Sequence, residues 1–282
     1  MTDVSNEMKN HVGRAYHMLK NLDAFNEKEV RGVALGQTNS TLRESCFLGN
    51  YLRSIANVKT LLKLGSIEDS QVVAIIARSI FEMAVEIHLI DCIPDSPSKI
   101  IAFGELERLK RARKIVKFTE THPNHSPRLD DPLFKSFIDR EGSRIESNSN
   151  RLWPNKKIAL THWSQLNLRQ RAELIGDKIL EMYDSEYQMH SWYVHAGITG
   201  VINTEPEFYW VLCGVALVFA ADSFELILGS VIRLCNLEQA DAKIWKKLEC
   251  SKMLSFTESD AQATELWRQA LGFGATVSLV GG

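Results

Sequence analysis

Apolar residues recur every three or four positions along most of the chain, which is the spacing of one face of an α-helix. This pattern predicts helices over residues 4–22, 40–64, 67–91, 98–121, 131–149, 181–196, 206–235 and 238–250, with shorter helices over 168–180. Alternating runs bounded by hairpin residues, which would predict strands, are weak. We therefore expect an all-α fold, a single multi-helix bundle.

The most apolar stretch, residues 208–221, reads FYWVLCGVALVFAA. It is shorter than the roughly 18–20 residues that span a bilayer, and Asp222 and Glu225 follow it directly. We therefore expect the helix over 206–235 to lie at the centre of the bundle and not in a membrane. The first 20 residues lack the apolar core of a signal peptide, which indicates a cytoplasmic protein.

Turn residues divide this bundle into three parts. Residues 1–66 form an N-terminal helical pair, residues 67–255 the helical core, and residues 256–282 a C-terminal helix with a Gly-rich tail. Neither an internal repeat nor a low-complexity linker separates them, so we expect one compact domain.

Composition and charge narrow the classes of function. The 282 residues are 45% hydrophobic and carry a net charge of −2, so the chain as a whole does not attract nucleic acid. Its five cysteines form no CxxC pair and predict reduced thiols, with Cys46, Cys92 and Cys213 in apolar surroundings. The spacings of a zinc site, a P-loop and a dinucleotide-binding loop do not occur, and we predict neither metal nor cofactor.

The first candidate site lies on the helix over 67–91. Arg78 and Glu82 are four residues apart, so they share a helix face and can pair. A buried arginine needs an acceptor. The pair is either a core ion pair that fixes helix packing or the charged wall of a site.

The second candidate lies in YDSEYQMHSWYVHAG, residues 183–197, where Tyr187, Ser191 and His195 recur every four residues. A serine one turn before a histidine can hydrogen-bond it. An imidazole with an ordinary pKa near 6.5 can transfer a proton or bind an anion. The alternative is a histidine that only caps or packs the end of its helix.

The third candidate is the pair Asp222 and Glu225, which lie on the central apolar helix. Buried carboxylates are paired, protonated or bound to metal, and Arg78, His195 and Arg233 are their candidate partners. If the three candidates meet, they form one polar cluster. We then assign Arg78, Glu82, Ser191 and His195 to catalysis, and Tyr187, Asp222 and Glu225 to ligand binding.

The fourth candidate is the basic stretch RLKRARKIVK, residues 108–117, whose six positive charges could bind phosphates. The alternative is a solvated surface helix with a core face of Leu109, Ile115 and Phe118. Three acidic residues partly neutralise the stretch, namely Glu105, Glu107 and Glu120.

Two segments together resemble a bacterial helical family known as domain of unknown function 5677. The matching motifs are Arg-Ser-x-x-Glu at Arg78, Ser79 and Glu82; Trp-x-x-Leu at Trp163 and Leu166; and Tyr-x3-Tyr-x3-Ser-x3-His at Tyr183, Tyr187, Ser191 and His195. The resemblance covers residues 70–210. It implies a helical fold and no particular activity.

Helical bacterial proteins of this kind also resemble HEPN-type ribonucleases of toxin–antitoxin and phage-defence systems, whose signature is Arg, four to six residues, then His. None of the eight histidines has an arginine at that distance. A near arrangement is Lys117-x4-His122, but lysine lacks the forked guanidinium. Metal-independent cleavage would therefore need His195, as general acid and base, to meet Arg78 across helices.

Three hypotheses follow. We favour a helical module that binds a small ligand or a partner protein, in a bacterial defence or toxin–antitoxin context. The alternative is a HEPN-like ribonuclease or nucleotide-processing enzyme that uses Arg78 and His195. The third is an obligate oligomer built on the helix over 206–235. Candidate partners are another protein, a second copy of this chain, and RNA or a nucleotide.

Overall fold

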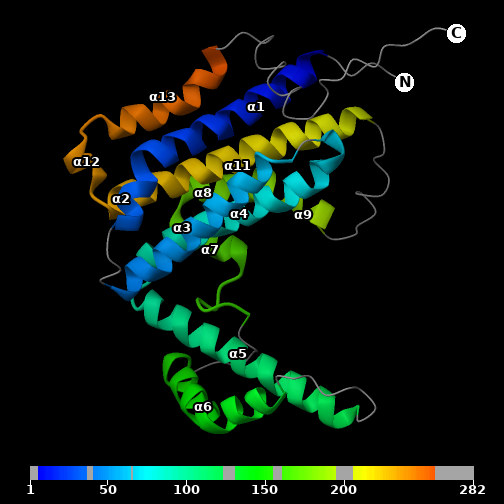
Figure 1. Cartoon of the computed structure of the whole chain (residues 1–282), viewed down its shortest axis with the longest axis vertical. Helices are drawn as coiled ribbons and strands as arrows, with labels where there is room; N and C mark the ends of the chain where they lie inside the picture. Colours follow the sequence, from blue (N-terminus) through cyan, green and yellow to red (C-terminus); the bar gives the residue numbers. More distant parts are fainter. Residues whose placement is uncertain are drawn as a thin grey trace, which may run out of the picture. The chain divides into compact units, whose positions relative to one another are not determined.

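The computed structural model describes residues 6–36, 41–64, 66–122, 131–154, 161–194 and 206–257. All regular secondary structure in these ranges is helical (Figure 1). The predicted all-α class is therefore confirmed, and the first helices begin and end within a few residues of the predicted positions.

The chain divides into two compact units, one of residues 1–92 with 168–282 and the other of residues 93–167. The helices on either side of residue 66 pack against each other within the larger unit. The structure therefore divides the chain at residues 92 and 168, which the turn residues of the sequence did not indicate.

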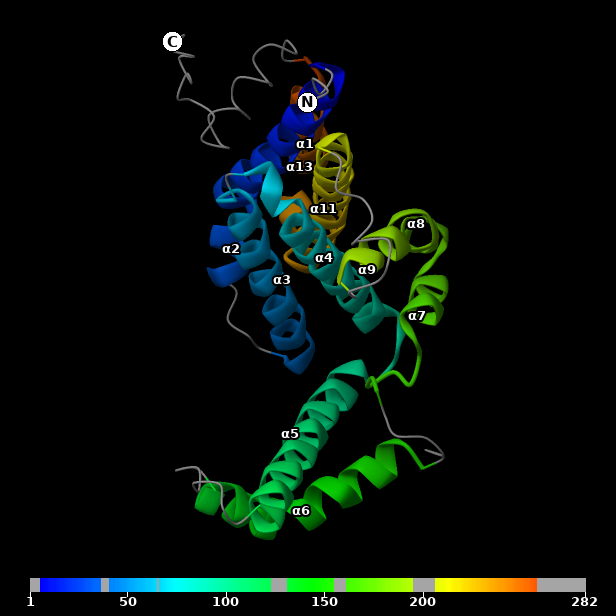
Figure 2. The same cartoon turned by 90° about the vertical axis from the view of Figure 1, so that its right-hand side faces the viewer.

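The larger unit has a central layer of two long helices with shorter helices around it. The elements are α1 (Asn6–Phe25), η1 (Asn26–Val30), α2 (Arg31–Gly36), α3 (Leu42–Leu61), η2 (Ile67–Asp69), α4 (Ser70–Cys92), α7 (Leu168–Ile175), α8 (Asp177–Met182), η3 (Tyr183–Tyr187), α9 (Gln188–Val194), α11 (Pro206–Leu234), α12 (Leu237–Ala240) and α13 (Ile244–Thr257). The most extensive packing joins α11 to α4, and α1 covers another side of α11 (Figure 1, Figure 2).

The helix α11 is the predicted central apolar helix. The stretch Glu207–Leu234 is long and apolar enough to cross a membrane by length and composition alone, but 67% of its most apolar window is buried inside the protein. Phe219 and Phe224 are fully buried, and the ring of Phe219 lies 5.0 Å from that of Phe81 on α4. This burial is typical of the core helix of a soluble protein.

Local chemistry explains where α3 begins. The side chain of Thr41 accepts a hydrogen bond from the backbone N–H of Glu44 at 3.2 Å, and the Glu44 carboxylate accepts one from the backbone N–H of Thr41 at 3.1 Å. This capping box satisfies two donors that the first turn would leave unpaired. Thr41 is therefore the N-cap residue of α3.

The smaller unit contains α5 (Ser96–Thr121) packed against α6 (Asp131–Leu152). Leu106, Leu109 and Ile145 are buried in it, and so is Trp153, whose indole N–H donates to the Trp163 carbonyl at 3.0 Å. The prediction that Phe118 lies on the core face of α5 is wrong, because Phe118 is 49% exposed. Nine residues separate it from Leu109, which is two and a half turns and so the opposite side of the helix.

The cysteines are free thiols, and their burial corrects one prediction. Cys213 is buried and Cys46 is half-buried, but Cys92 is exposed because it is the last residue of α4. The apolar sequence around Cys92 belongs to the preceding turns of that helix and does not cover its end.

A close approach of α1 and α11 makes Gly214 a tight position for any larger residue. A Cβ at Gly214 would lie 2.7 Å from His11 Cδ2 and 3.2 Å from Cγ2 of the buried Val12, whereas a Cβ at Gly229 would meet Trp245 at an ordinary 3.4 Å. Alanine adds up to about 1 kcal/mol of helix propensity at either site. We expect Gly214→Ala to be less stable than Gly229→Ala by about 1–3 kcal/mol, because overpacking opposes the gain. Equal free energies of unfolding in urea would contradict this contact.

Candidate functional site

Arg78 and Glu82 form the predicted ion pair, and Tyr187 completes it. The Arg78 Nε–H donates to Glu82 Oε1 at 3.0 Å and to the Tyr187 hydroxyl oxygen at 2.7 Å. The Tyr187 hydroxyl in turn donates to the same Glu82 oxygen at 2.6 Å. We call these three side chains the Arg78 cluster. Two of them lie one turn apart on α4, and the third comes from 105 residues later in the chain.

The Tyr187 side chain is positioned by a π-helical turn. Residues 183–187 form η3, which joins α8 to α9 with a wider turn than an α-helix has. The Tyr187 ring stacks on that of Tyr183, with centroids 5.1 Å apart, and lies 5.4 Å from the ring of Phe81. Such π-helical turns inside α-helices occur frequently at functional sites, but the sequence spacing that indicated a regular helix did not reveal this one.

Burial affects the pKa of the Tyr187 hydroxyl in this cluster. Tyr187 is buried, and burial together with the Glu82 carboxylate raises the pKa of its hydroxyl, although Arg78 opposes the shift. The phenol therefore stays protonated at neutral pH and acts as a donor to Glu82. The charge of the pair remains partly accessible, because the Arg78 side chain is 21% exposed and the Glu82 side chain 43%.

The guanidinium of Arg78 is held on one side only. Its Cζ lies 4.8 Å from the centre of the Tyr187 ring, a cation–π contact, and its Nε is used by Glu82 and Tyr187. Its Nη1 is buried and has no hydrogen-bond partner among the described residues. A buried charged donor without an acceptor is unfavourable, so this edge of the guanidinium has unused binding capacity.

The Ser191 hydroxyl bonds to its own helix, and its predicted catalytic role stays a prediction. The Ser191 hydroxyl donates to the backbone carbonyl of Tyr187 at 3.0 Å, one turn earlier in the helix, so its proton is engaged by the backbone. His195 lies outside the described residues, and its predicted meeting with Arg78 stays a prediction.

A second ion pair extends the polar face of α4. Glu86, one turn beyond Glu82, accepts from Arg171 Nη1 of α7 at 2.5 Å, and both side chains are largely buried. Neither residue was predicted from the sequence as part of a site. The spacing of Arg78, Glu82 and Glu86 at four-residue intervals could have identified Glu86, but no local pattern indicates Arg171.

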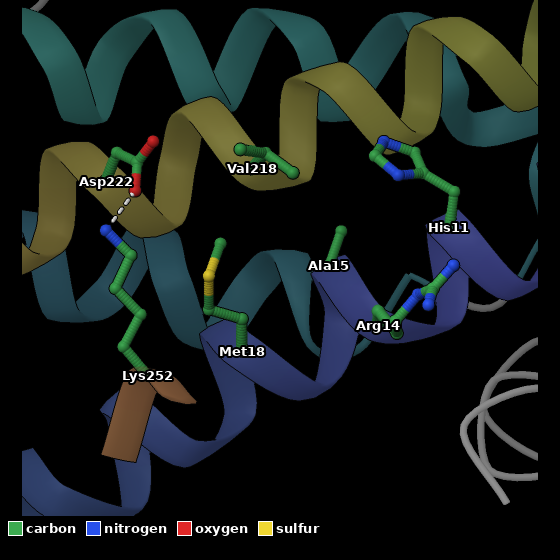
Figure 3. Close-up of a pocket in the computed structure, with 7 residues that line it drawn as sticks. All are labelled: His11, Arg14, Ala15, Met18, Val218, Asp222 and Lys252. Carbon is green, nitrogen blue, oxygen red and sulfur yellow. Dashed lines mark ion pairs between the residues drawn. The ribbon is translucent and has the colours of Figure 1, made fainter. Parts of the chain in front are cut away.

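Asp222 and Glu225 belong to a different cluster from Arg78. The ammonium of Lys252 on α13 lies 2.7 Å from a carboxylate oxygen of each, whereas neither carboxylate hydrogen-bonds or pairs with Arg78 or Arg233 in the described part of the chain. The predicted pairing with Arg78 and Arg233 is therefore wrong, because Lys252 reaches these carboxylates from α13. Pairing with His195, which lies outside the described residues, stays a prediction. The Asp222–Lys252 pair lies at one end of a cavity of about 470 Å³ whose other end holds His11 and Arg14 (Figure 3).

A carboxylate of η3 also responds to Asp222. Burial raises the pKa of Glu186 to about 7, and the nearby charges of Asp222 and Glu181 act in the same direction.

In the described ranges, no three His, Cys, Asp or Glu side chains converge as a metal site would require.

His190 is a buried polar residue that was not predicted from the sequence. It is 0% exposed, its ring lies 5.0 Å from that of Phe219, and neither ring nitrogen has a hydrogen-bond partner within the described structure. Burial lowers its pKa to about 4, so the imidazole is neutral at pH 7. It lies on α9, three residues after Tyr187. The Phe219 ring that it contacts also contacts Phe81, which in turn packs against Tyr187.

This burial predicts a pH-dependent stability. An unfolded histidine binds a proton near its ordinary pKa of about 6.5, whereas folded His190 does so only near pH 4. Its contribution is therefore fully present above pH 6.5 and is lost as the pH falls from 6.5 to 4, by about 3 kcal/mol in total. We expect His190→Phe to remove this part of the acid destabilisation, measured as the free energy of unfolding at several pH values. The exposed His11→Phe is the control, and equal pH profiles for the two variants would contradict the prediction.

A family model supports the resemblance in these motifs. No match was found among curated proteins or among solved structures. The model described as "Family of unknown function (DUF5677)" matches residues 44–206, which include the Arg78 cluster and begin earlier than the segment that the motifs alone indicated. The match covers more than half of the 282 residues. The chain therefore belongs to this family of unknown function, DUF5677.

Proposed function

We propose that this protein is a binding module that holds an oxyanion, a phosphate or carboxylate group, at Arg78. The observation that carries the proposal is the one-sided use of the Arg78 guanidinium. Its Nε is fixed by Glu82 and Tyr187, and its buried Nη1 has no acceptor among the described residues. A bound oxyanion would supply that acceptor.

The geometry suits an oxyanion because guanidinium is planar and presents its N–H groups in a fixed fork. Two parallel N–H donors on one edge bind carboxylate or phosphate oxygens together, which a lysine ammonium cannot do. The cation–π contact with Tyr187 and the two Nε hydrogen bonds hold the plane of Arg78 before any ligand arrives. A side chain ordered in advance loses less entropy on binding.

The chemistry of the cluster favours binding over catalysis. A general base needs a pKa near the working pH, but the pKa of Tyr187 is raised and its proton is donated to Glu82. The Ser191 hydroxyl is engaged by the helix backbone. The alternative of a HEPN-like ribonuclease rests on His195 and stays a prediction, as do a defence or toxin–antitoxin context and a cytoplasmic location.

Thermal unfolding with inorganic phosphate tests the proposal, at constant ionic strength adjusted with chloride. Phosphate at ten times its Kd should stabilise the protein by about 1.4 kcal/mol, which raises Tm by roughly 3–6 °C. We expect Arg78→Lys to abolish this shift, because lysine can still pair with Glu82 but lacks the fork.

The matched control is Arg171→Lys, which makes the same change in the adjacent buried pair with Glu86. It should keep the full phosphate response. The proposal fails if Arg78→Lys responds as the unaltered protein does, or if neither phosphate nor acetate shifts the Tm of the unaltered protein.

A further inference from the structure

The two units carry opposite net charge, which the near-neutral total conceals. Residues 93–167 contain 14 Lys and Arg against 9 Asp and Glu, and the rest of the chain contains 19 against 26. The smaller unit is therefore positive and the larger one negative. The exclusion of polyanions from the net charge of −2 does not apply to the smaller unit by itself.

The positive charge of this unit gathers on the exposed face of α5. Arg108, Arg111 and Lys114 follow one another at three-residue intervals, and all three are exposed. Phe118 continues the same face one turn later, with its ring stacked on that of His122 at a centroid distance of 4.3 Å and an interplanar angle of 19°. We call these five residues the α5 stripe.

The cations of the stripe differ from several other cations of the unit, which are paired with carboxylates. Across α5 and α6, salt bridges join Arg113 to Glu146, Arg144 to Glu105 and Lys135 to Glu120. Arg108, Arg111 and Lys114 have no such carboxylate partner among the described residues.

The acidic residue next to these cations, Glu107, already pairs with Lys110 at 2.7 Å. The stripe therefore keeps its positive charge, although acidic residues are available on both helices.

From this arrangement we infer that the α5 stripe binds single-stranded nucleic acid. Arg108, Arg111 and Lys114 contact successive phosphates, and an unpaired base stacks on Phe118. Cationic side chains that follow the backbone, combined with an aromatic surface for bases, are the two components of sequence-independent single-strand binding. The site is separate from Arg78 and does not depend on the oxyanion proposal.

The packing of α5 disfavours an anionic membrane as the partner. A helix that lies in a membrane interface inserts a wide apolar face into the lipid. The apolar face of α5, with Leu106, Leu109 and Ala112, is buried. Phe118 is the apolar member of the exposed stripe, and one ring suits stacking on a base better than insertion into a bilayer.

Fluorescence anisotropy of the full chain with fluorescein-labelled dT20 measures the binding. Three phosphate contacts predict that log Kobs falls with log salt at a slope of about −2, which is roughly a 20-fold loss of affinity between 50 and 200 mM NaCl. We expect Arg111→Glu with Lys114→Glu to weaken binding at least tenfold and to flatten this slope.

The matched control is Lys20→Glu with Arg53→Glu, which makes the same charge change at two exposed residues of the larger unit. It should bind dT20 within about twofold of the unaltered protein, since long-range charge effects are screened at these salt concentrations. An equal loss of binding in the control and the stripe variant would overturn the inference. All four side chains are exposed, and circular dichroism checks that both variants fold.

The aromatic half of the stripe has its own test. Phe118→Ala should weaken dT20 binding by about 5- to 100-fold without changing the salt slope, because stacking releases no counterions. It should leave binding to heparin, a polyanion without bases, unchanged. The control Ile101→Ala alters another exposed apolar residue of α5 and should have no effect.

Two outcomes would overturn the assignment to single strands. One is unchanged dT20 affinity in Phe118→Ala. The other is tighter binding to phosphatidylglycerol vesicles, or to a 20-base-pair duplex, than to dT20 under the same salt.

Discussion

Burial of α11 between α1 and α4 is the constraint on which the larger unit depends. This helix brings Phe219 against Phe81 of α4, and the same ring supports His190 of α9. The close approach of α1 at Gly214 leaves little room for a side chain. Because α4 uses one side for this contact, its other side is left to face α7, η3 and α9.

That other side of α4 carries the Arg78 cluster and the Glu86–Arg171 ion pair. Arg78 and Glu82 meet Tyr187, and one turn later Glu86 meets Arg171. Partly buried ion pairs add little net stability over an apolar contact of the same shape, because the charges lose hydration. A contribution to stability alone therefore does not explain why this face is charged, and this is consistent with our proposal that it recognises a charged ligand.

The net charge of the whole chain conceals the opposite charges of its two units. A net charge of −2 describes neither the positive smaller unit nor the negative remainder. On α5 the distinction is finer still, because Arg113 is paired with Glu146 of α6, whereas Arg108, Arg111 and Lys114 have no carboxylate partner among the described residues. Whether a basic helix is merely solvated or able to bind depends on this pairing, which becomes visible only when its neighbours are known.

The sequence by itself determined the features that depend on spacing within one helix. These include the helical class, the central apolar helix, the Thr41 cap and the Arg78–Glu82 pair, because residues three or four apart meet in any helix. The same periodicity also places Phe118 opposite Leu109 on α5. The prediction of one core face that contains both residues was therefore wrong on spacing alone. Only the tertiary structure decided that Tyr187 joins Arg78 and that Lys252 holds Asp222 and Glu225. These partners come from distant segments, and the packing of whole helices around α11 selects them, which no local pattern encodes.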